Sequence, residues 1–151
     1  MKLSTKTRYG LRALVDLASY GENEQVALAK ISTRQELSVS YMEQVFVTLR
    51  KVNIIKSTKG AQGGYSLARS SEEITVGEVI RALEGQILIV EESKNKASES
   101  LIAHNMEKCL QKEVWTPINE SINEVIDNIT LAELVQDMLK TSEAFIDMYY
   151  I

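Results

Sequence analysis

Cysteine, proline, histidine and tryptophan each occur only once among the 151 residues of this chain. The single cysteine, Cys109, excludes an intrachain disulfide. No apolar run approaches the roughly 20 residues that a membrane helix needs, and the first six residues lack the apolar core of a signal peptide. The sequence also offers no nucleophile–base pair, no phosphate-binding loop and no metal set of histidines and carboxylates. We therefore expect a cytoplasmic protein that does not contact membranes and is not an enzyme.

Charge is distributed unevenly along the chain. The net charge is −4 at pH 7, but residues 1–60 contain ten Lys and Arg against five Asp and Glu, whereas residues 61–151 contain seven against sixteen. The basic first part favours contact with a polyanion such as nucleic acid, and the acidic second part does not. Chance clustering of charges on solvated faces is the alternative.

Apolar residues recur at helical spacing in the first part of the chain. They predict three helices, over residues 4–21, 27–36 and 41–52. Ser4 is the expected N-cap of the first helix, and a capping box from Ser40 to Glu43 is expected to open the third. The residues expected to be buried in these helices are Leu11, Leu14, Val15, Leu17, Ala18, Leu28, Ile31, Met42, Val45, Phe46 and Leu49.

A β-hairpin is predicted directly after the third helix. Alternating residues at 54–57 and 65–68 read as two strands, and the glycine-rich segment 59–64 reads as the turn between them. A fourth helix is expected from the capping box at Thr75 to Gly85. Three helices followed by a hairpin is the order of a winged helix-turn-helix. The predicted fold class is mostly α, with a winged helix-turn-helix domain over residues 1–85 and a long dimerisation helix.

The C-terminal part is predicted to consist of a loop, a long helix and a tail. Residues 86–108 contain a short apolar run and then a polar stretch without periodicity, which predicts a flexible, exposed loop. Residues 109–151 are expected to hold an amphipathic helix to about Ile129, which either begins at Pro117 or is kinked there. A capping box at Thr130 predicts a final short helix, followed by an apolar tail.

The long helix carries an apolar stripe that a small domain cannot easily cover by itself. We expect it to pair with the same helix of a second chain and form a homodimer. The alternative is that the stripe folds back on its own winged domain. Its residues are Leu110, Val114, Trp115, Ile118, Ile122, Val125, Ile126 and Ile129.

The start of the third helix is the expected reader of the DNA major groove. Ser38, Ser40 and Tyr41 can hydrogen-bond phosphate. Gln44 can pair with adenine, and Glu43 can accept a hydrogen bond from cytosine. The alternative for Ser40 and Glu43 is a capping role alone.

Basic residues outside this helix are expected to add contacts to the DNA backbone. At the far end of the helix, Arg50 can reach phosphate or simply favour a helix C-terminus. Lys2, Arg8 and Tyr9 at the start of the first helix can add further phosphate contacts. These residues predict a protein that binds double-stranded DNA.

The hairpin turn is the second expected contact with DNA. Lys59 would lie in the minor groove, and Gly60, Gly63 and Gly64 would let the backbone approach it closely. A solvated hairpin that needs glycine for its turn is the alternative, although it does not explain the basic tip. A further hypothesis is a winged helix used only for contacts with other proteins, and the basic turn argues against it.

Four segments in order, 2–10, 38–44, 59–65 and 129–131, resemble the bacterial regulator family of IscR, NsrR and CymR. The resemblance spans nearly the whole chain. It implies a dimeric winged-helix transcription regulator of promoter DNA, in which the long helix near the C-terminus makes the dimer.

Members similar to IscR hold an iron–sulfur cluster through three cysteines, each separated from the next by five residues. This chain has Cys109 at the third position but Ala103 and Ala97 at the other two. One thiolate cannot hold such a cluster. The resemblance thus implies a cluster, expected as the 2Fe-2S type, in a form of the protein that has all three cysteines. In this chain as it stands, no cluster is expected. Lys112 occupies the position of a frequent histidine ligand, which leaves a fourth ligand in doubt. His104 could substitute for it, and the alternative is that His104 is simply an exposed histidine.

Two interpretations of the vacant positions remain open. In the first, Ala97 and Ala103 replace cysteines of a cluster sensor that controls genes of iron–sulfur cluster biogenesis, and the chain represents its apo form. In the second, the chain resembles CymR, a repressor of sulfur metabolism genes, and is gated by a protein partner or by oxidation of Cys109. The ending Tyr149-Tyr150-Ile151 resembles the tail of CymR-like proteins and implies a cysteine-synthase-type partner. An apolar tail packed on the dimer is the alternative.

Overall fold

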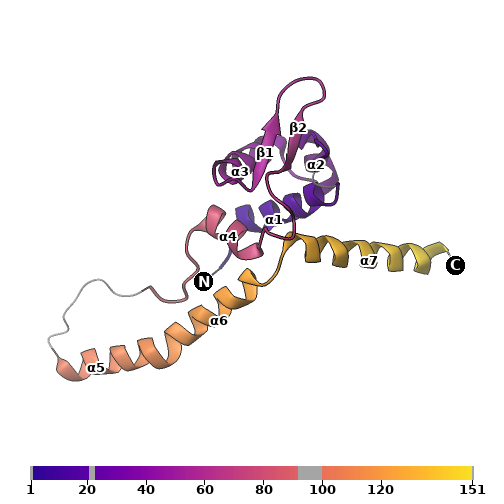
Figure 1. Cartoon of the computed structure of the whole chain (residues 1–151). Coiled ribbons are helices and arrows are strands. Elements are labelled where there is room, and N and C mark those ends of the chain that lie inside the picture. Colours follow the sequence, from indigo (N-terminus) through magenta and orange to yellow (C-terminus); the bar gives the residue numbers. More distant parts are fainter. Residues whose placement is uncertain (1, 21–22, 92–99, 151) are drawn as a thin grey trace.

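The computed structural model describes residues 2–20, 23–91 and 100–150. Its elements in chain order are α1 (Thr5–Ala18), α2 (Leu28–Gln35), α3 (Val39–Lys51), β1 (Ile55–Thr58), β2 (Gly64–Leu67), α4 (Val76–Glu84), α5 (Leu101–Leu110), a π-helical turn (Gln111–Trp115), α6 (Thr116–Asp127) and α7 (Leu131–Tyr150). Helices α1 to α4 and the hairpin gather in one domain, and two helical arms, α5–α6 and α7, leave it in different directions (Figure 1). None of the described helices is both long and apolar enough to cross a membrane.

The core of the domain forms where the apolar faces of α1, α3 and α4 meet. All the residues expected to be buried in α3, and all but two of those expected in α1 and α2, are buried in this core. The exceptions, Leu11 and Val15, are half-buried at its edge and pack against it. Close packing of α1 against α4 depends on Gly10, because an added Cβ would lie 2.7 Å from Leu83 Cδ1. The predicted winged-helix core is therefore confirmed.

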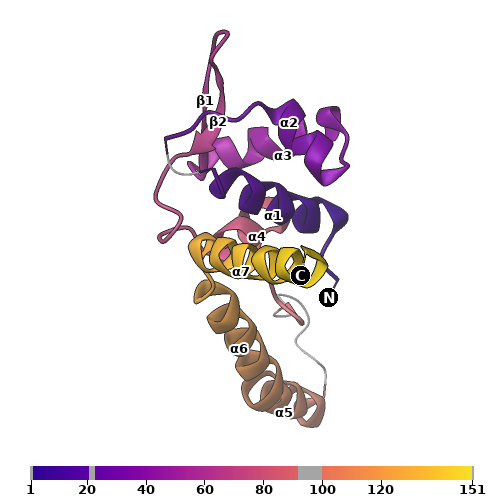
Figure 2. The ribbon, with the colours of Figure 1, turned by 90° about the vertical axis from the view of Figure 1, so that its right-hand side faces the viewer.

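The wing is a two-stranded antiparallel sheet in which Ile55 lies opposite Leu67 and Thr58 opposite Gly64. It projects beyond α2 and α3 at one end of the domain (Figure 2). Val26 adds an isolated bridge to Tyr65, through two backbone hydrogen bonds of 2.8 Å. The sequence analysis did not predict this third segment, because a single extended residue has no periodicity.

The arm formed by α5 and α6 is attached to the domain through α4. Arg81 of α4 forms an ion pair of 2.7 Å with Asp127 of α6, and this contact holds the pKa of Asp127 below its usual value. Asn119 of α6 accepts a hydrogen bond of 2.7 Å from the backbone N–H of Ile89, and Asn123 donates one to the carbonyl of Ile87. The segment that follows α4 is therefore held against α6 by these hydrogen bonds.

The predicted loop over residues 86–108 is wrong in its last part. Residues 101–110 form α5, for which Ser100 is the N-cap and accepts from the N–H of Ala103. Apolar residues such as Leu101 and Met106 lie on this helix but remain exposed, so no described part of the chain covers its apolar side chains. Residues 92–99 lie outside the described residues.

Pro117 neither starts nor sharply ends the long helix. The helix widens into the π-helical turn just before it, where the N–H of Thr116 donates to the carbonyl of Gln111, five residues back. Because proline has no N–H to donate, a local change of hydrogen-bond pattern lets the helix pass through it. The long helix therefore does not begin at Pro117, which was the first of the two alternatives that the sequence left open.

The predicted final short helix and tail are one long helix. Thr130 and Glu133 form the predicted capping contacts, with distances of 2.8 and 3.2 Å from the backbone N–H groups to the side-chain oxygens. However, α7 extends over 20 residues and includes Tyr149 and Tyr150, which the sequence analysis placed in a tail. Its first turns pack against α1, and its second half projects beyond the domain (Figures 1 and 2).

Candidate nucleic-acid interface

The second helix of the helix-turn-helix pair, α3, begins two residues earlier than predicted. Its N-cap is Ser38, whose hydroxyl accepts a hydrogen bond of 3.3 Å from the N–H of Tyr41. The predicted capping box of Ser40 and Glu43 is therefore wrong, and both side chains lie within the helix and are exposed. With exposed Gln44, they leave a row of polar groups free to contact a ligand.

The starts of α1 and α3 meet through two aromatic rings. Tyr9 and Tyr41 pack edge to face with their centroids 6.4 Å apart. Tyr41 is half-buried by this contact, while Arg8 and Lys2 are exposed. The structure thus brings Tyr9 next to the first turn of α3, whereas it records no contact between Lys2 and α3 among the described residues.

The far end of α3 is tied to the wing. Arg50 donates a hydrogen bond of 3.1 Å from Nη1 to the hydroxyl of Ser57 in β1. This contact was not predicted, since Ser57 has no pattern that pairs it with a helix. It joins two of the predicted DNA-contacting elements, α3 and the hairpin, into one surface.

Lys59 lies at the start of the wing turn, directly after β1, and is exposed. Gly60 follows with a φ of 108°, a conformation that residues with a side chain rarely adopt. Its carbonyl accepts a hydrogen bond of 3.0 Å from the N–H of Gly63, which closes the turn. The glycines of this turn therefore have an intramolecular role, and Lys59 is presented beside a well-defined tip.

Gly64 has an intramolecular role that the sequence analysis did not predict. An added Cβ would lie 2.6 Å from the carbonyl oxygen of Val26. The segment that approaches Gly64 closely is therefore the chain itself, and close approach of DNA is not needed to explain this glycine.

The exposed surface of α3 also contains Val47, which the sequence analysis did not assign to any site. It is 39% exposed, one turn further along the helix than Glu43 and Gln44. Its only signal in the sequence is its position between the buried residues Phe46 and Leu49.

The apolar stripe of the long helix is divided between two faces. Ile122, Ile126 and Ile129 pack against Val76, Ile80 and Ile87 of their own domain. This part of the stripe therefore packs on its own winged domain, which was the alternative to dimerisation in the sequence analysis. Leu110, Ile118 and Val125 are exposed, whereas Val114 and Trp115 are half-buried. An i+4 row advances around a helix by roughly 40° at each step, which explains why one row serves two faces.

Two of the three predicted cluster positions lie on α5. Ala103 and Cys109 lie on the same helix, and Cys109 is exposed. Ala97 lies outside the described residues. Within the described part of the chain, no group of three His, Cys, Asp or Glu side chains comes together as a metal site. His104 is half-buried, and Lys112 pairs with Glu113 at 3.2 Å.

The end of α7 is an exposed apolar surface. Phe145 and Tyr149 pack against each other with their ring centroids 4.5 Å apart. Ile146 and Met148 beside them are more than half exposed. Ile151 lies outside the described residues.

Comparison with known proteins agrees with this geometry. The model of the family Rrf2, described as iron-dependent transcriptional regulator, matches residues 3–137. The chain is 39% identical to protein rrf2 of Nitratidesulfovibrio vulgaris over 91% of this chain and 89% of the relative. It is 38% identical to the transcriptional regulator IscR of Yersinia pseudotuberculosis over 95% of this chain and 85% of the relative.

Solved structures of two regulators are similar to this fold. CymR, the global cysteine regulator of B. subtilis, aligns with a TM-score of 0.75 and 34% identity, over 90% of this chain and 97% of CymR. IscR of T. potens aligns with a TM-score of 0.70 and 40% identity, over 91% of this chain and 88% of that IscR. The relatives are named as transcriptional regulators, not as enzymes.

Proposed function

Because the chain belongs to the Rrf2 family of iron-dependent transcriptional regulators, we propose that it is a homodimer that binds specific promoter sequences through α3 and the wing. The observation that carries this proposal is the joining of α3 to the wing through Arg50 and Ser57. This contact aligns an exposed polar helix with a basic hairpin tip. Promoter binding in turn places the protein in the bacterial cytoplasm.

In the proposed complex, α3 enters the major groove. Gln44 pairs with adenine, Glu43 accepts from cytosine, and Val47 contacts a thymine methyl group. Phosphate contacts hold the helix in register; their residues are Lys2, Arg8, Tyr9, Ser38, Ser40, Tyr41 and Arg50. Lys59 enters the minor groove at the tip formed by Gly60 and Gly63.

The proposed dimer uses the exposed part of the arm. Helix α5 has no buried residue in the chain, yet it carries several large apolar side chains. A contiguous apolar surface of this kind marks a protein contact. Leu110, Ile118 and Val125 continue it along α6, and the half-buried Val114 and Trp115 complete it.

An iron–sulfur cluster fits this chain poorly. Cys109 is the single thiol, while such clusters take four ligands. We propose that cluster sensing of the IscR kind belongs to a form with cysteines at positions 97 and 103. In this chain, we derive no regulatory step through a cluster.

A CymR-like repressor of sulfur metabolism is the second candidate. The exposed apolar end of α7 favours it, because nothing in the described chain covers Phe145 and Tyr149. A cysteine-synthase-type protein is the proposed partner at this end. Oxidation of exposed Cys109 is the alternative signal.

Substitution of Lys59 tests the DNA interface. The promoter is a duplex selected by the wild-type protein from a random pool. Lys59→Ala is expected to weaken binding several-fold and to lower the slope of log K against log salt concentration by about one, because one phosphate contact is lost. Lys140→Ala, on the exposed surface of α7, is the matched control and should leave both values unchanged. Equal affinity and slope for Lys59→Ala would contradict the wing assignment.

Reconstitution separates the two candidate signals. Ala97→Cys and Ala103→Cys are combined, iron and sulfide are added without oxygen, and visible absorption is recorded beside the unchanged chain. Absorption only in the double variant supports descent from a cluster sensor. Absence of absorption in both proteins favours the CymR-like candidate, whose partner would then be sought at the end of α7.

A further inference from the structure

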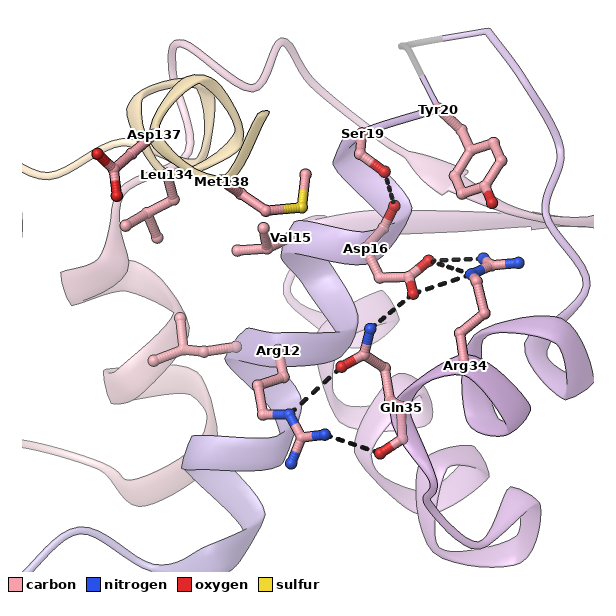
Figure 3. Close-up of a pocket in the computed structure, with 11 residues that line it drawn as sticks. Arg12, Val15, Asp16, Ser19, Tyr20, Arg34, Gln35, Leu134, Asp137 and Met138 are labelled. Carbon is pink, nitrogen blue, oxygen red and sulfur yellow. Dashed lines mark hydrogen bonds and ion pairs between the residues drawn. The ribbon is translucent and has the colours of Figure 1, made fainter. Parts of the chain in front are cut away.

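A cavity of about 600 Å³ lies between the DNA-binding domain and α7 (Figure 3). One wall is aliphatic: Leu11 and Val15 of α1 face Leu134 and Met138 of α7. The volume falls within the range of roughly 300–1,000 Å³ that is typical of small-molecule sites. The DNA interface proposed above does not use any of these residues.

The opposite wall is polar and is built around a buried carboxylate. The Asp16 side chain is 5% exposed and receives two hydrogen bonds from Arg34 Nε, at 3.1 and 3.2 Å, and one from Arg34 Nη2 at 2.6 Å. Gln35 donates a further hydrogen bond of 2.8 Å. The charge of Arg34 is therefore balanced by Asp16, and neither group is available to neutralise a ligand.

Arg12 is the cation of the cavity whose charge is not balanced. Its guanidinium donates to the side-chain oxygen of Gln35 at 3.3 Å and to the backbone oxygen of Gln35 at 2.7 Å, and both acceptors are neutral. No carboxylate of the described residues lies within 4.0 Å of it. Asp137 also lines the cavity, but its carboxylate lies on the outer side of α7, away from Arg12 (Figure 3).

We propose that this cavity binds a small carboxylic acid with an apolar body. The carboxylate pairs with Arg12, which offers a planar set of donors suited to two oxygens. The apolar body lies against Val15, Leu134 and Met138, where it removes apolar surface from water.

The position of the cavity gives the ligand a route to the DNA-binding helix. Gln35 is the last residue of α2, and Glu36 after it turns the chain with a φ of 56° just before Ser38 caps α3. A carboxylate that pairs with Arg12 competes with Gln35 for its donors and so alters the anchoring of this turn. This regulatory consequence rests on the proposed function, whereas binding itself does not.

Octanoate is the probe, and 1-octanol is its uncharged counterpart. Both are titrated calorimetrically into the full chain. Octanoate should bind the wild-type protein, and Arg12→Gln should weaken it by about tenfold because a charge-assisted contact is lost. Arg12→Lys should restore part of the loss, and 1-octanol should bind the wild type and Arg12→Gln equally. Lys140→Gln, another exposed cation outside the cavity, is the control.

Met138→Trp fills the cavity and should abolish the binding of both probes, with circular dichroism as the check that the variant is folded. Octanoate binding that is absent from the wild type, or unchanged in both Arg12→Gln and Met138→Trp, would overturn the proposal. If octanoate fails to bind and Met138→Trp weakens dimerisation, the cavity is instead filled by a second copy of the chain.

Promoter affinity tests the regulatory part separately. Saturating octanoate should change the affinity of the wild type for the selected promoter more than threefold and leave that of Arg12→Gln within twofold. Unchanged affinity in the wild type with octanoate bound overturns the regulatory part. Failure to bind any promoter overturns the proposed function, and the calorimetry then still decides whether the cavity binds carboxylates.

Discussion

A single carboxylate ties the start of the first helix to the end of the fourth. Glu84 Oε1 accepts hydrogen bonds of 2.7 Å from both the backbone N–H of Ser4 and the hydroxyl of Thr7. These bonds hold the pKa of Glu84 below its usual value. The Thr7 side chain is fully buried, so Glu84 is the partner that satisfies its hydroxyl.

Removal of this partner should destabilise the fold. Glu84→Ala is expected to lower the free energy of unfolding by about 1–2 kcal/mol, because the buried hydroxyl of Thr7 is left without a partner. Urea unfolding at pH 7 measures the change. Exposed Glu120→Ala is the control, and an equal loss in both variants would contradict the role of Glu84.

The same carboxylate should make stability depend on pH. Because its pKa is lower in the folded state, its contribution is present above the unfolded pKa of about 4.3 and is lost as the pH falls through the folded value. Glu84→Gln keeps an acceptor oxygen but removes the charge. Its free energy of unfolding should therefore fall less steeply than that of the wild type below about pH 4.5. Parallel curves for the two proteins would rule out this contribution.

At the scale of elements, the hairpin depends on its bridge to Val26. Gly64→Ala would place a Cβ 2.6 Å from the Val26 carbonyl oxygen, and the paired backbones cannot separate without losing two hydrogen bonds. We expect a loss of about 1–3 kcal/mol in stability, as for other overpacked sites. Thermal unfolding measures it, with exposed Ala61→Ser in the same turn as the control.

This substitution also separates two roles of the glycine. If Gly64→Ala left stability unchanged but weakened promoter binding, the glycine would serve approach to DNA instead of packing against Val26. If Gly64→Ala instead lowered the stability of a protein in which Lys59 is unchanged, the role of Gly64 would be in the fold.

Across the whole molecule, the two arms leave the domain in different directions (Figures 1 and 2), and both carry exposed apolar side chains. Leu110 on α5 is 48% exposed and Leu139 on α7 is 49% exposed. The proposed dimer uses the first surface and not the second. These two leucines are therefore a matched pair for testing which arm joins the subunits.

Leu110→Glu should dissociate the dimer, because it places a charge in an apolar contact. We expect the dimer dissociation constant to rise at least a hundredfold by sedimentation equilibrium, whereas Leu139→Glu should leave it unchanged. Affinity for a promoter with two half-sites should fall more than affinity for one half-site. The reverse order of the two variants would assign dimerisation to α7.

Several features were predictable because they depend on neighbours in the sequence. The caps at Ser4, Thr75 and Thr130 have characteristic side chains at fixed spacing, and all three are present. The cap of α3 was misplaced because Ser38 and Ser40 both suit the position. Helix α5 was missed although Ile102, Met106 and Leu110 recur at i+4 spacing, because this pattern covers fewer than three turns and follows directly on a long polar stretch.

The winged-helix order, the buried faces of its helices and the basic tip of the wing could all be predicted from the sequence, since each follows from local spacing and residue type. Three contacts became visible in the folded chain alone: Glu84 satisfies Thr7, Val26 packs against Gly64, and Arg12 lines a cavity beside α7. These contacts join segments far apart along the chain, and the energies that select them come from packing and hydrogen bonding between elements. No pattern within one element contains that information.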